Sequence, residues 1–278
     1  MSATQRKRAL VFDSGVGGLS VLDAIVNAGL AVDLDYVADN AWLPYGEKPD
    51  AALVARVPAL IRALVDEWAP DAVVIACNTA STIALDAVRA AIAAPVVGVV
   101  PPIKPAAEAT KTGVIGLLAT PATVARPYTD ELIAKFAADK TVIRFGSTAL
   151  VDAAERVLAG GEVNREAVAE ALHGLFDAPG GDRLDVVALA CTHFPLLRDA
   201  LAIAAPRPVL WLDSGAAIAR RLKDVLALGD GSARLRRAAF TGPVNARLWL
   251  AFEARGFSVR ARIEAGFSVV PDTGERYG

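Results

Sequence analysis

The chain has two cysteines, and they occur in matching local sequences. Asp71–Thr79 has the sequence Asp-Ala-Val-Val-Ile-Ala-Cys-Asn-Thr, and Asp185–His193 has the sequence Asp-Val-Val-Ala-Leu-Ala-Cys-Thr-His. In each segment an apolar run typical of a buried strand leads to the cysteine, Cys77 or Cys191, and polar residues follow. Open α/β sheets bind ligands at the carboxyl ends of their parallel strands. We therefore expect both thiols at ligand-binding edges.

Two thiols at such positions could act as an acid and a base. Backbone N–H groups and a helix N-terminus after each strand are expected to lower the thiol pKa from its ordinary value of about 8.5. A thiolate then accepts a proton and a neutral thiol donates one. The structural alternative is that Cys77 and Cys191 are packing residues, because free cysteine is often buried. A redox pair is disfavoured because there is no C-x-x-C spacing, and no paired Cys/His spacing predicts a zinc site.

The two histidines have different surroundings in the sequence. His193 lies two residues after Cys191 and is predicted at the same strand edge, where it could assist that thiol. The alternative for His193 is a hydrogen-bonded core histidine. His173 falls in a helical stretch and is expected to be a solvated or packed residue.

A glycine-rich segment, Asp13-Ser-Gly-Val-Gly-Gly18, follows the first predicted strand. Glycines let backbone amides approach a ligand, and the helix N-terminus that follows favours an anion. The spacing fits neither G-x-G-x-x-G nor G-x-x-x-x-G-K-[ST], so a carboxylate-sized ligand is favoured over a nucleotide. A plain tight turn is the alternative. Asp13 itself could orient a thiol or act as its partner.

A polar and aromatic loop, Asp39–Lys48, leaves the second predicted strand, and such loops often contact ligands. Its alternative is a rigid turn held by Pro44 and Gly46. Neutral hydrogen-bonding side chains are predicted at the same edges: Asn78, Thr79, Ser81, Thr120, Thr123 and Thr192.

Short apolar runs alternate with amphipathic stretches along the chain, which predicts βαβ units and mostly parallel sheets. The predicted strands are 9–12, 34–37, 72–76, 96–100, 113–119, 142–145, 186–190 and 209–212. The predicted helices are 15–28, 50–68, 80–93, 124–137, 166–175, one from about 195, and 216–228. Prolines at 101, 102 and 105 mark a boundary between two halves.

Composition limits the classes of function. The 278 residues are 54% hydrophobic and 22% charged, which suits one large or two small globular domains rather than a disordered or fibrous protein. A net charge of −2 gives no reason to expect nucleic acid as a partner. No apolar run approaches the roughly 20 residues of a membrane span, and Ala9–Phe12 after the basic segment Met1–Arg8 is too brief for a signal peptide. With two cysteines and no disulfide framework, we expect a cytoplasmic protein.

Taken together, these motifs resemble the glutamate racemase family of the aspartate/glutamate racemase superfamily. The resemblance covers about residues 9–222 and fades over the last fifty or so. It is carried by Phe12–Ser20, Ala38–Asn40 with Pro44–Gly46, Ala76–Ser81, Cys191–Leu196 and Asp213–Ala219.

The resemblance implies a fold of two doubly wound α/β domains, pseudo-two-fold related, that face each other across a cleft. Residues 1–99 plus 212–278 would form the first domain, and residues 100–211 the second.

The implied reaction is a cofactor-independent 1,1-proton transfer that interconverts L- and D-glutamate and supplies D-glutamate for peptidoglycan. Cys77 would act on D-glutamate and Cys191 on L-glutamate, assisted by Asp13, Glu155 and His193. A pyridoxal mechanism is disfavoured, because no lysine is predicted at a strand edge where it could form the Schiff base. The family's substrate contacts map to Asp13, Ser14, Tyr45, Gly46, Asn78, Thr79, Thr192 and His193, and no metal is implied.

The resemblance leaves some partners open. Family members include homodimers, and some Gram-negative members need a muramyl-nucleotide activator. The residue Phe194 is typical of that subgroup.

Two rival functions are considered. One is racemisation of another acid such as aspartate, which His193 disfavours, and the other is a protein-binding role, since some members inhibit DNA gyrase. A binding protein without chemistry is the last alternative.

Overall fold

The computed structural model describes residues 6–272, so the ends of the expected first domain, residues 1–5 and 273–278, lie outside the described residues. Within residues 6–272 the strands form two sheets, in the orders β11-β10-β9-β2-β1-β3-β4 and β6-β5-β7-β8. Neighbouring strands in these sheets are parallel, except that β10 and β11 are antiparallel. The predicted α/β class with mostly parallel sheets is confirmed, and the pseudo-two-fold relation stays a prediction.

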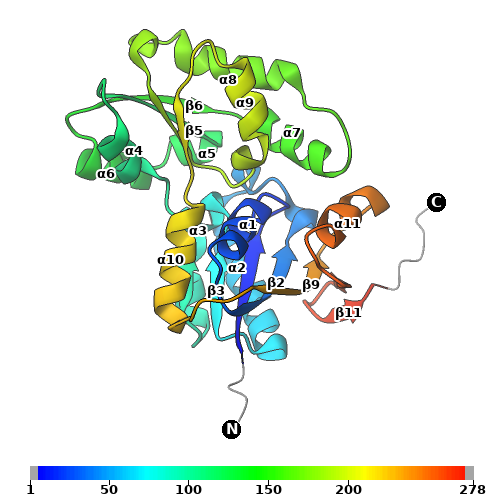
Figure 1. The fold of residues 1–278 in the computed structure, drawn as a ribbon. Coiled ribbons are helices and arrows are strands. Elements are labelled where there is room, and N and C mark those ends of the chain that lie inside the picture. The colour runs from blue at the N-terminus through cyan, green and yellow to red at the C-terminus, as the bar shows by residue number, and fades with distance from the viewer. Residues whose placement is uncertain (1–5, 273–278) are drawn as a thin grey trace.

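The first sheet combines both ends of the chain. Figure 1 shows it in the lower half, built from the blue N-terminal segments and the orange-to-red C-terminal ones. Its strands are β1 Lys7–Asp13, β2 Val32–Ala38, β3 Ala72–Ile75, β4 Val96–Gly98, β9 Arg234–Phe240, β10 Val259–Ile263 and β11 Val269–Pro271. The sequence did not predict β9, β10 and β11, which extend the sheet beyond β2.

The second sheet comes from the middle of the chain, green to yellow in Figure 1. Its strands are β5 Val114–Ala119, β6 Thr141–Gly146, β7 Val186–Leu189 and β8 Leu210–Leu212. Since β8 pairs with β7, Leu212 belongs to this sheet, although the expected boundary put it in the first domain.

Helices cover both faces of each sheet, because each buried strand is apolar on both sides. In β1, Ala9 and Val11 pack into a core with helices α1 and α10, whereas Leu10 and Phe12 pack into a core with α2 and α3. The α-helices are α1 Leu19–Asn27, α2 Asp50–Trp68, α3 Asn78–Ala91, α4 Ile103–Ala109, α5 Pro121–Val124, α6 Pro127–Phe136, α7 Ala149–Leu158, α8 Arg165–Phe176, α9 Arg198–Ala204, α10 Gly215–Leu226 and α11 Ala246–Glu253.

Proline explains two differences from the predicted helices. The helix expected over 124–137 begins only at Pro127, as α6, whereas Val124 ends the short helix α5, because Pro127 has no N–H to continue that helix. Conversely, α4 begins within the proline-rich segment that was expected only as a boundary. Pro105 lies in its first turn, where the missing N–H costs nothing.

Two further helices differ in ways that affect the site. The helix expected from Pro195 begins only at Arg198, and a 3₁₀-helix, Phe194–Leu197, precedes it. The helix α7 was not predicted, although Leu150, Val151 and Ala154 lie at helical spacing and are buried. In the described part of the chain, no helix is long and apolar enough to cross a membrane.

Candidate active site

Cys77 lies just beyond the carboxyl end of β3 and caps helix α3, as the sequence predicts. Its Sγ accepts the Ala80 N–H at 3.5 Å, and it also lies 3.5 Å from Ser14 Oγ. Ser14 Oγ also donates to Asp13 Oδ1 at 3.1 Å. A short chain of hydrogen bonds therefore links the Cys77 thiol to the Asp13 carboxylate.

The expectation that the helix N-terminus lowers the Cys77 pKa is wrong for this structure. Burial, together with the nearby Asp13 carboxylate, raises the pKa of Cys77 from 9.0 to about 12, while the contacts with Ser14 and Ala80 oppose the shift. Desolvation disfavours a thiolate here more than one N–H group favours it. The pKa of Asp13 is itself raised by burial, although His193 and Thr192 favour its charged form.

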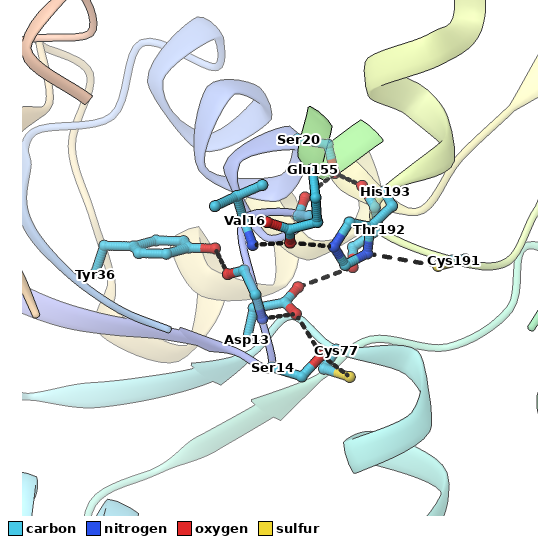
Figure 2. A network of polar contacts seen from close by, with 12 residues as sticks. Asp13, Ser14, Val16, Ser20, Tyr36, Cys77, Glu155, Cys191, Thr192 and His193 are labelled. Atoms are coloured by element: carbon cyan, nitrogen blue, oxygen red, sulfur yellow. Dashed lines mark hydrogen bonds and ion pairs between the residues drawn. The ribbon is translucent and has the colours of Figure 1, made fainter. Parts of the chain in front are cut away.

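Cys191 lies beyond the carboxyl end of β7 and has a different partner. Its Sγ is 3.8 Å from His193 Nδ1, and the other ring nitrogen, Nε2, is 2.8 Å from Glu155 Oε1 (Figure 2). Burial alone would lower the pKa of His193, but the contacts with Cys191 and Glu155 raise it well above its ordinary value. The imidazole is thus held as a cation that donates to both neighbours.

This arrangement replaces the helix dipole expected at Cys191. The residues after it form a turn and then a 3₁₀-helix, so no α-helix begins at the thiol. The positive charge beside Cys191 comes from the side chain of His193 instead.

The glycine-rich loop was expected to bind a carboxylate-sized ligand, but two of its amides bind carboxylates of the protein itself. The N–H of Val16 donates to Glu155 Oε1 at 2.8 Å, and the N–H of Gly15 donates to Asp13 Oδ1 at 3.1 Å. A Cβ at Gly15 would lie 2.3 Å from Glu155 Oε1, and one at Gly17 would lie 2.4 Å from His193 Nδ1. The loop therefore needs glycine because residues of the second half approach its backbone closely.

Two side chains join the halves directly at the site. Thr192 Oγ1 donates to Asp13 Oδ2 at 2.8 Å, and Ser20 Oγ on α1 lies 2.8 Å from the carbonyl oxygen of Thr192. The segment from Cys191 to His193 is thus held against the end of β1 and the start of α1, as Figure 2 shows.

Both cysteines line the same buried cavity, which has a volume of about 20 Å³. A larger groove of about 510 Å³ lies between α1 and α10 on the surface and contains neither cysteine. We assign the site to the small cavity because both thiols line it. Its lining residues are Ser14, Leu43, Pro44, Tyr45, Gly46, Cys77, Asn78, Thr79, Thr120, Val151, Cys191, Thr192 and His193.

The structure thus brings the predicted site residues together, with differences in detail. Asp13 and Glu155 do not line the cavity but hydrogen-bond to residues that do. The Tyr45 hydroxyl is not directed to a ligand, since it donates to Asp39 Oδ2 at 2.5 Å. Asn78 is buried, and its Oδ1 has no hydrogen-bond partner, which leaves an acceptor at the cavity.

Two of the other expected edge residues have structural roles. The Ser81 hydroxyl donates to the carbonyl of Ile75 and accepts from the N–H of Val99, so it ties β3 to the segment after β4. Thr123 is fully buried against Thr120, the N-cap of α5. His173 is exposed and pairs with Asp177 on α8, as expected for a solvated histidine.

Sequence reasoning missed Tyr36 and the pair Asp39–Arg56. Tyr36 was placed only in a strand, yet its hydroxyl donates to the carbonyl of Gly15 at 2.7 Å. Arg56 on α2 donates to both oxygens of Asp39 at 2.7 Å and lies over the Trp42 ring, which fixes the loop that carries Tyr45. No local signal in the sequence indicates these partners, because each contact joins different elements.

Within residues 6–272, no group of three or more His, Cys, Asp or Glu side chains is arranged to hold a metal ion. The polar groups of the site are instead paired with one another across the two halves.

Two mostly parallel sheets, each with a cysteine just beyond the carboxyl end of a strand and both cysteines at one cavity, define the class of protein: a two-sheet α/β protein with its site between the sheets. The family model described as Asp/Glu/Hydantoin racemase matches residues 17–222. The chain is 54% identical to a glutamate racemase of Sphingopyxis alaskensis, over 81% of this chain and 82% of that protein. It is 44% identical to a glutamate racemase of a Shewanella species, over 94% of both chains.

A solved structure gives the same result. The chain resembles the crystal structure of Escherichia coli glutamate racemase in complex with L-glutamate and the activator UDP-MurNAc-ala. The TM-score is 0.85 at 40% identity, covering 95% of this chain and 99% of that one. The chain therefore belongs to the Asp/Glu/hydantoin racemase family, and within it to the glutamate racemases, which are isomerases.

Proposed function

We propose that this chain racemises glutamate by a two-thiol 1,1-proton transfer without a cofactor and so supplies D-glutamate for peptidoglycan. The observation that carries the mechanism is that Cys77 and Cys191, from different sheets, line one cavity. A racemase of this kind needs a base on one face of the α-carbon and an acid on the other.

In the direction from L- to D-glutamate, the Cys191 thiolate removes the α-proton and becomes a thiol. The electron pair left on the α-carbon takes a proton from the Cys77 thiol on the opposite face, and Cys77 becomes a thiolate. In the reverse direction the two cysteines exchange roles. Exchange of protons with solvent or with the next substrate restores the starting forms.

The surroundings of the two thiols favour the forms that L-glutamate requires. Asp13 and burial keep Cys77 protonated, and the Cys77–Ser14–Asp13 hydrogen bonds hold the thiol in place. His193, held as a cation by Glu155, is a donor to Cys191 and can balance the charge of a thiolate there. Asp13, Glu155 and His193 thus assist the two thiols.

Substrate binding is assigned to the polar groups of the cavity wall. The first residues of α3, Asn78 and Thr79, place a helix N-terminus near the substrate carboxylate, where positive charge also stabilises the carbanionic transition state. The unpartnered Oδ1 of Asn78 suits the substrate ammonium group as an acceptor. Further contacts are assigned to Ser14, Tyr45, Gly46, Thr192 and His193, with Asp13 acting through Ser14 and Thr192.

We propose that residues 1–99 plus 212–278 and residues 100–211 act as two domains that move apart to admit the substrate. A cavity of about 20 Å³ has room for a water molecule, which needs roughly 10–15 Å³, but not for glutamate. Closure around glutamate would exclude water and strengthen the electrostatic interactions at the α-carbon.

We extend the proposal to a muramyl-nucleotide activator, because the E. coli enzyme described above was crystallised with UDP-MurNAc-ala. Activity would then rise when UDP-MurNAc-ala is added to the assay, and unchanged rates would remove the activator from the proposal. We also propose that the protein forms a homodimer. Light scattering during gel filtration tests this, because it measures the molar mass of the protein in solution.

The reaction is tested by incubating the purified protein with L- or D-glutamate in D₂O without added cofactor. We expect racemisation from both sides, with deuterium at the α-carbon of the product. Cys77→Ser and Cys191→Ser should each abolish racemisation, because an alcohol is a far weaker acid than a thiol. Near-full turnover in either variant would refute the two-thiol mechanism.

Two controls make this result specific. His173→Gln changes an exposed histidine outside the site and should leave turnover unchanged, whereas His193→Gln should reduce it. Aspartate in the same assay tests the rival substrate, and we expect turnover with glutamate to be much faster. A supercoiling assay of DNA gyrase with the Cys77→Ser variant separates any protein-binding role from catalysis.

A further inference from the structure

The peptide group between Gly15 and Val16 is held from both sides. Its carbonyl oxygen accepts the Tyr36 hydroxyl at 2.7 Å, and its N–H donates to Glu155 Oε1 at 2.8 Å. Because a peptide group is planar and rigid, these two bonds together fix its orientation. Figure 2 shows Tyr36 and Glu155 on opposite sides of this backbone segment.

The hydrogen bonds continue from this peptide to the second thiol. Glu155 Oε1 also accepts from His193 Nε2 at 2.8 Å, and His193 Nδ1 lies 3.8 Å from Cys191 Sγ. Glu155 Oε1 thus accepts both from the Val16 N–H and from His193, so the orientation of the Gly15–Val16 peptide fixes where this oxygen lies for the imidazole. Tyr36 stands at the start of this series and Cys191 at its end.

We propose that Tyr36 is a positioning residue for Cys191: its hydroxyl orients the Gly15–Val16 peptide, which holds Glu155 against His193 and so sets the imidazolium beside the Cys191 sulfur. Tyr36 lines no part of the cavity and does not contact the reacting atoms. The proposal rests on the proposed function, in which Cys191 exchanges the proton of L-glutamate.

The position of the Tyr36 hydroxyl is itself fixed by the C-terminal part of the chain. The Tyr36 ring is fully buried and packs edge-on against Phe252 of α11 at 5.4 Å and Phe257 at 6.4 Å between centroids. Arg255, which lies between these two phenylalanines in the sequence, donates hydrogen bonds to the carboxylate of Asp23 on α1. The segment after β9 therefore packs against Tyr36, and none of its described residues, 241–272, lines the cavity.

The direction of the first hydrogen bond follows from the chemistry of the phenol. Burial and the nearby Asp13 carboxylate raise the pKa of Tyr36 well above its ordinary value of 10.0, so Tyr36 keeps its proton. It is thus always a donor, and the carbonyl of Gly15 is its acceptor.

Tyr36→Phe tests the proposal because it removes the hydroxyl and keeps the ring. We expect kcat/KM to fall about tenfold, the effect of one lost hydrogen bond near the upper end of the usual range. L- and D-glutamate are equally stable, so kcat/KM must fall equally in both directions. The isotope effects of the two directions are free to differ, and they report which proton transfer was slowed.

If the Cys191 step is the one slowed, removal of the α-proton from L-glutamate limits the rate more strongly. The substrate deuterium isotope effect on kcat/KM should then rise with L-[2-²H]glutamate and fall with D-[2-²H]glutamate. Ser14→Ala is the matched variant on the other thiol, because Ser14 contacts Cys77, and it should change the two isotope effects in the opposite sense. A merely structural role of Tyr36 predicts no such asymmetry.

Each outcome has one meaning. Isotope effects that keep their wild-type values in both directions, an unchanged kcat/KM, or the same change of the isotope effects in Tyr36→Phe and Ser14→Ala would overturn the proposal. A third outcome is that Tyr36→Phe raises the isotope effect with D-[2-²H]glutamate and lowers it with L-[2-²H]glutamate, while Ser14→Ala does the reverse. This outcome would leave the positioning role intact and refute the assignment of Cys191 to L-glutamate. Survival of racemisation in Cys191→Ser would refute the proposed function itself.

A second measurement guards against a general loss of structure. The Tyr36→Phe/Glu155→Gln double variant should lose less than the product of the two single effects, because both changes break the same series of hydrogen bonds. Independent, multiplicative effects would contradict the connection between Tyr36 and Glu155. Thermal unfolding of each variant tests whether the fold is retained, which we expect because Tyr36→Phe keeps the ring that packs against Phe252 and Phe257.

Discussion

The Thr192 hydroxyl donates to the Asp13 carboxylate at 2.8 Å, although the two residues are 179 positions apart in the chain. Thr192 follows one cysteine and Asp13 contacts the other through Ser14, so this bond joins the surroundings of the two thiols. A change at Thr192 should therefore affect chemistry at both cysteines.

Thr192→Val keeps the shape of the side chain and removes the donor. The pKa of Asp13, already raised by burial, should rise further because the charged form loses a hydrogen bond. We expect kcat/KM for glutamate to fall about tenfold or more, since a buried acceptor is left unpaired. Steady-state kinetics by polarimetry or circular dichroism measures this change.

The control is Thr110→Val, which breaks the same kind of bond elsewhere. Thr110 Oγ1 donates to Asp185 Oδ1 at 2.6 Å. Thr110 precedes β5 and Asp185 precedes β7, so this bond lies at the amino ends of the strands, away from the cavity. This variant should lower the unfolding temperature but leave kcat/KM near its original value. Equal losses of activity in both variants would mean that the Thr192 effect is only structural.

Alkylation with iodoacetamide should distinguish the two thiols. The pKa of Cys77 is raised to about 12, so its reactive thiolate is scarce at pH 7 and becomes abundant only in strongly alkaline solution. Cys191 lies beside the His193 cation and in the same cavity, so a reagent that reaches one thiol can reach the other. We expect mass spectrometry to find Cys191 modified first, and Cys77 to react faster as the pH rises. Modification of Cys77 first at pH 7 would contradict the raised pKa of Cys77.

Gly17→Ala should disturb the contact between the two halves. The added Cβ would lie 2.4 Å from His193 Nδ1 and 2.7 Å from Thr192 Oγ1, so these side chains must shift. We expect a loss of stability of about 1–3 kcal/mol together with a large loss of kcat. Gly229→Ala is the control, because a Cβ there meets no atom within 4 Å. Wild-type kcat in Gly17→Ala would show that this close approach is not needed for turnover.

Asp39→Asn should weaken substrate binding more than it slows the chemistry. Asp39 is fully buried and accepts from Tyr45 and Arg56, so the change releases the loop that carries Tyr45 and Gly46 to the cavity. We expect KM for glutamate to rise several-fold with a smaller change in kcat.

Asp35→Asn is the matched control on β2, the strand that leads to Asp39, since Asp35 is also buried and paired with an arginine, Arg237. It should reduce stability without raising KM. If both variants raised KM alike, the effect would come from β2 as a whole and not from the loop.

Much of this molecule follows from local sequence. The apolar runs before Cys77 and Cys191 predicted β3 and β7 and placed both thiols just beyond strand ends, because side-chain period and strand length are local properties. The α2 helix matches its predicted bounds, Asp50–Trp68. The C-terminal strands were not predicted, because the alternation of apolar residues is weak in Arg234–Phe240, where arginines pair with Asp35 in the folded sheet.

The pKa shifts and charge partners of the site could not be predicted from the local sequence. From its position before α3, Cys77 was expected to have a lowered pKa, but the depth of burial and the nearby Asp13 raise it. Glu155 was identified only through the family resemblance, and the structure gives it two partners, Val16 and His193, from different elements. Burial and charge pairing depend on residues far apart in the chain.

The amino-acid sequence alone determined the α/β class, the strand ends that carry the cysteines, and the glycines of the first loop, because short-range sterics and hydrophobic periodicity decide these features. The tertiary structure decided which charges face each thiol: Asp13 near Cys77, and His193 with Glu155 near Cys191. It also decided that Tyr36 and the C-terminal aromatic residues support the glycine loop. The physical reason is that desolvation and Coulomb interactions depend on distance in space, and folding alone sets that distance.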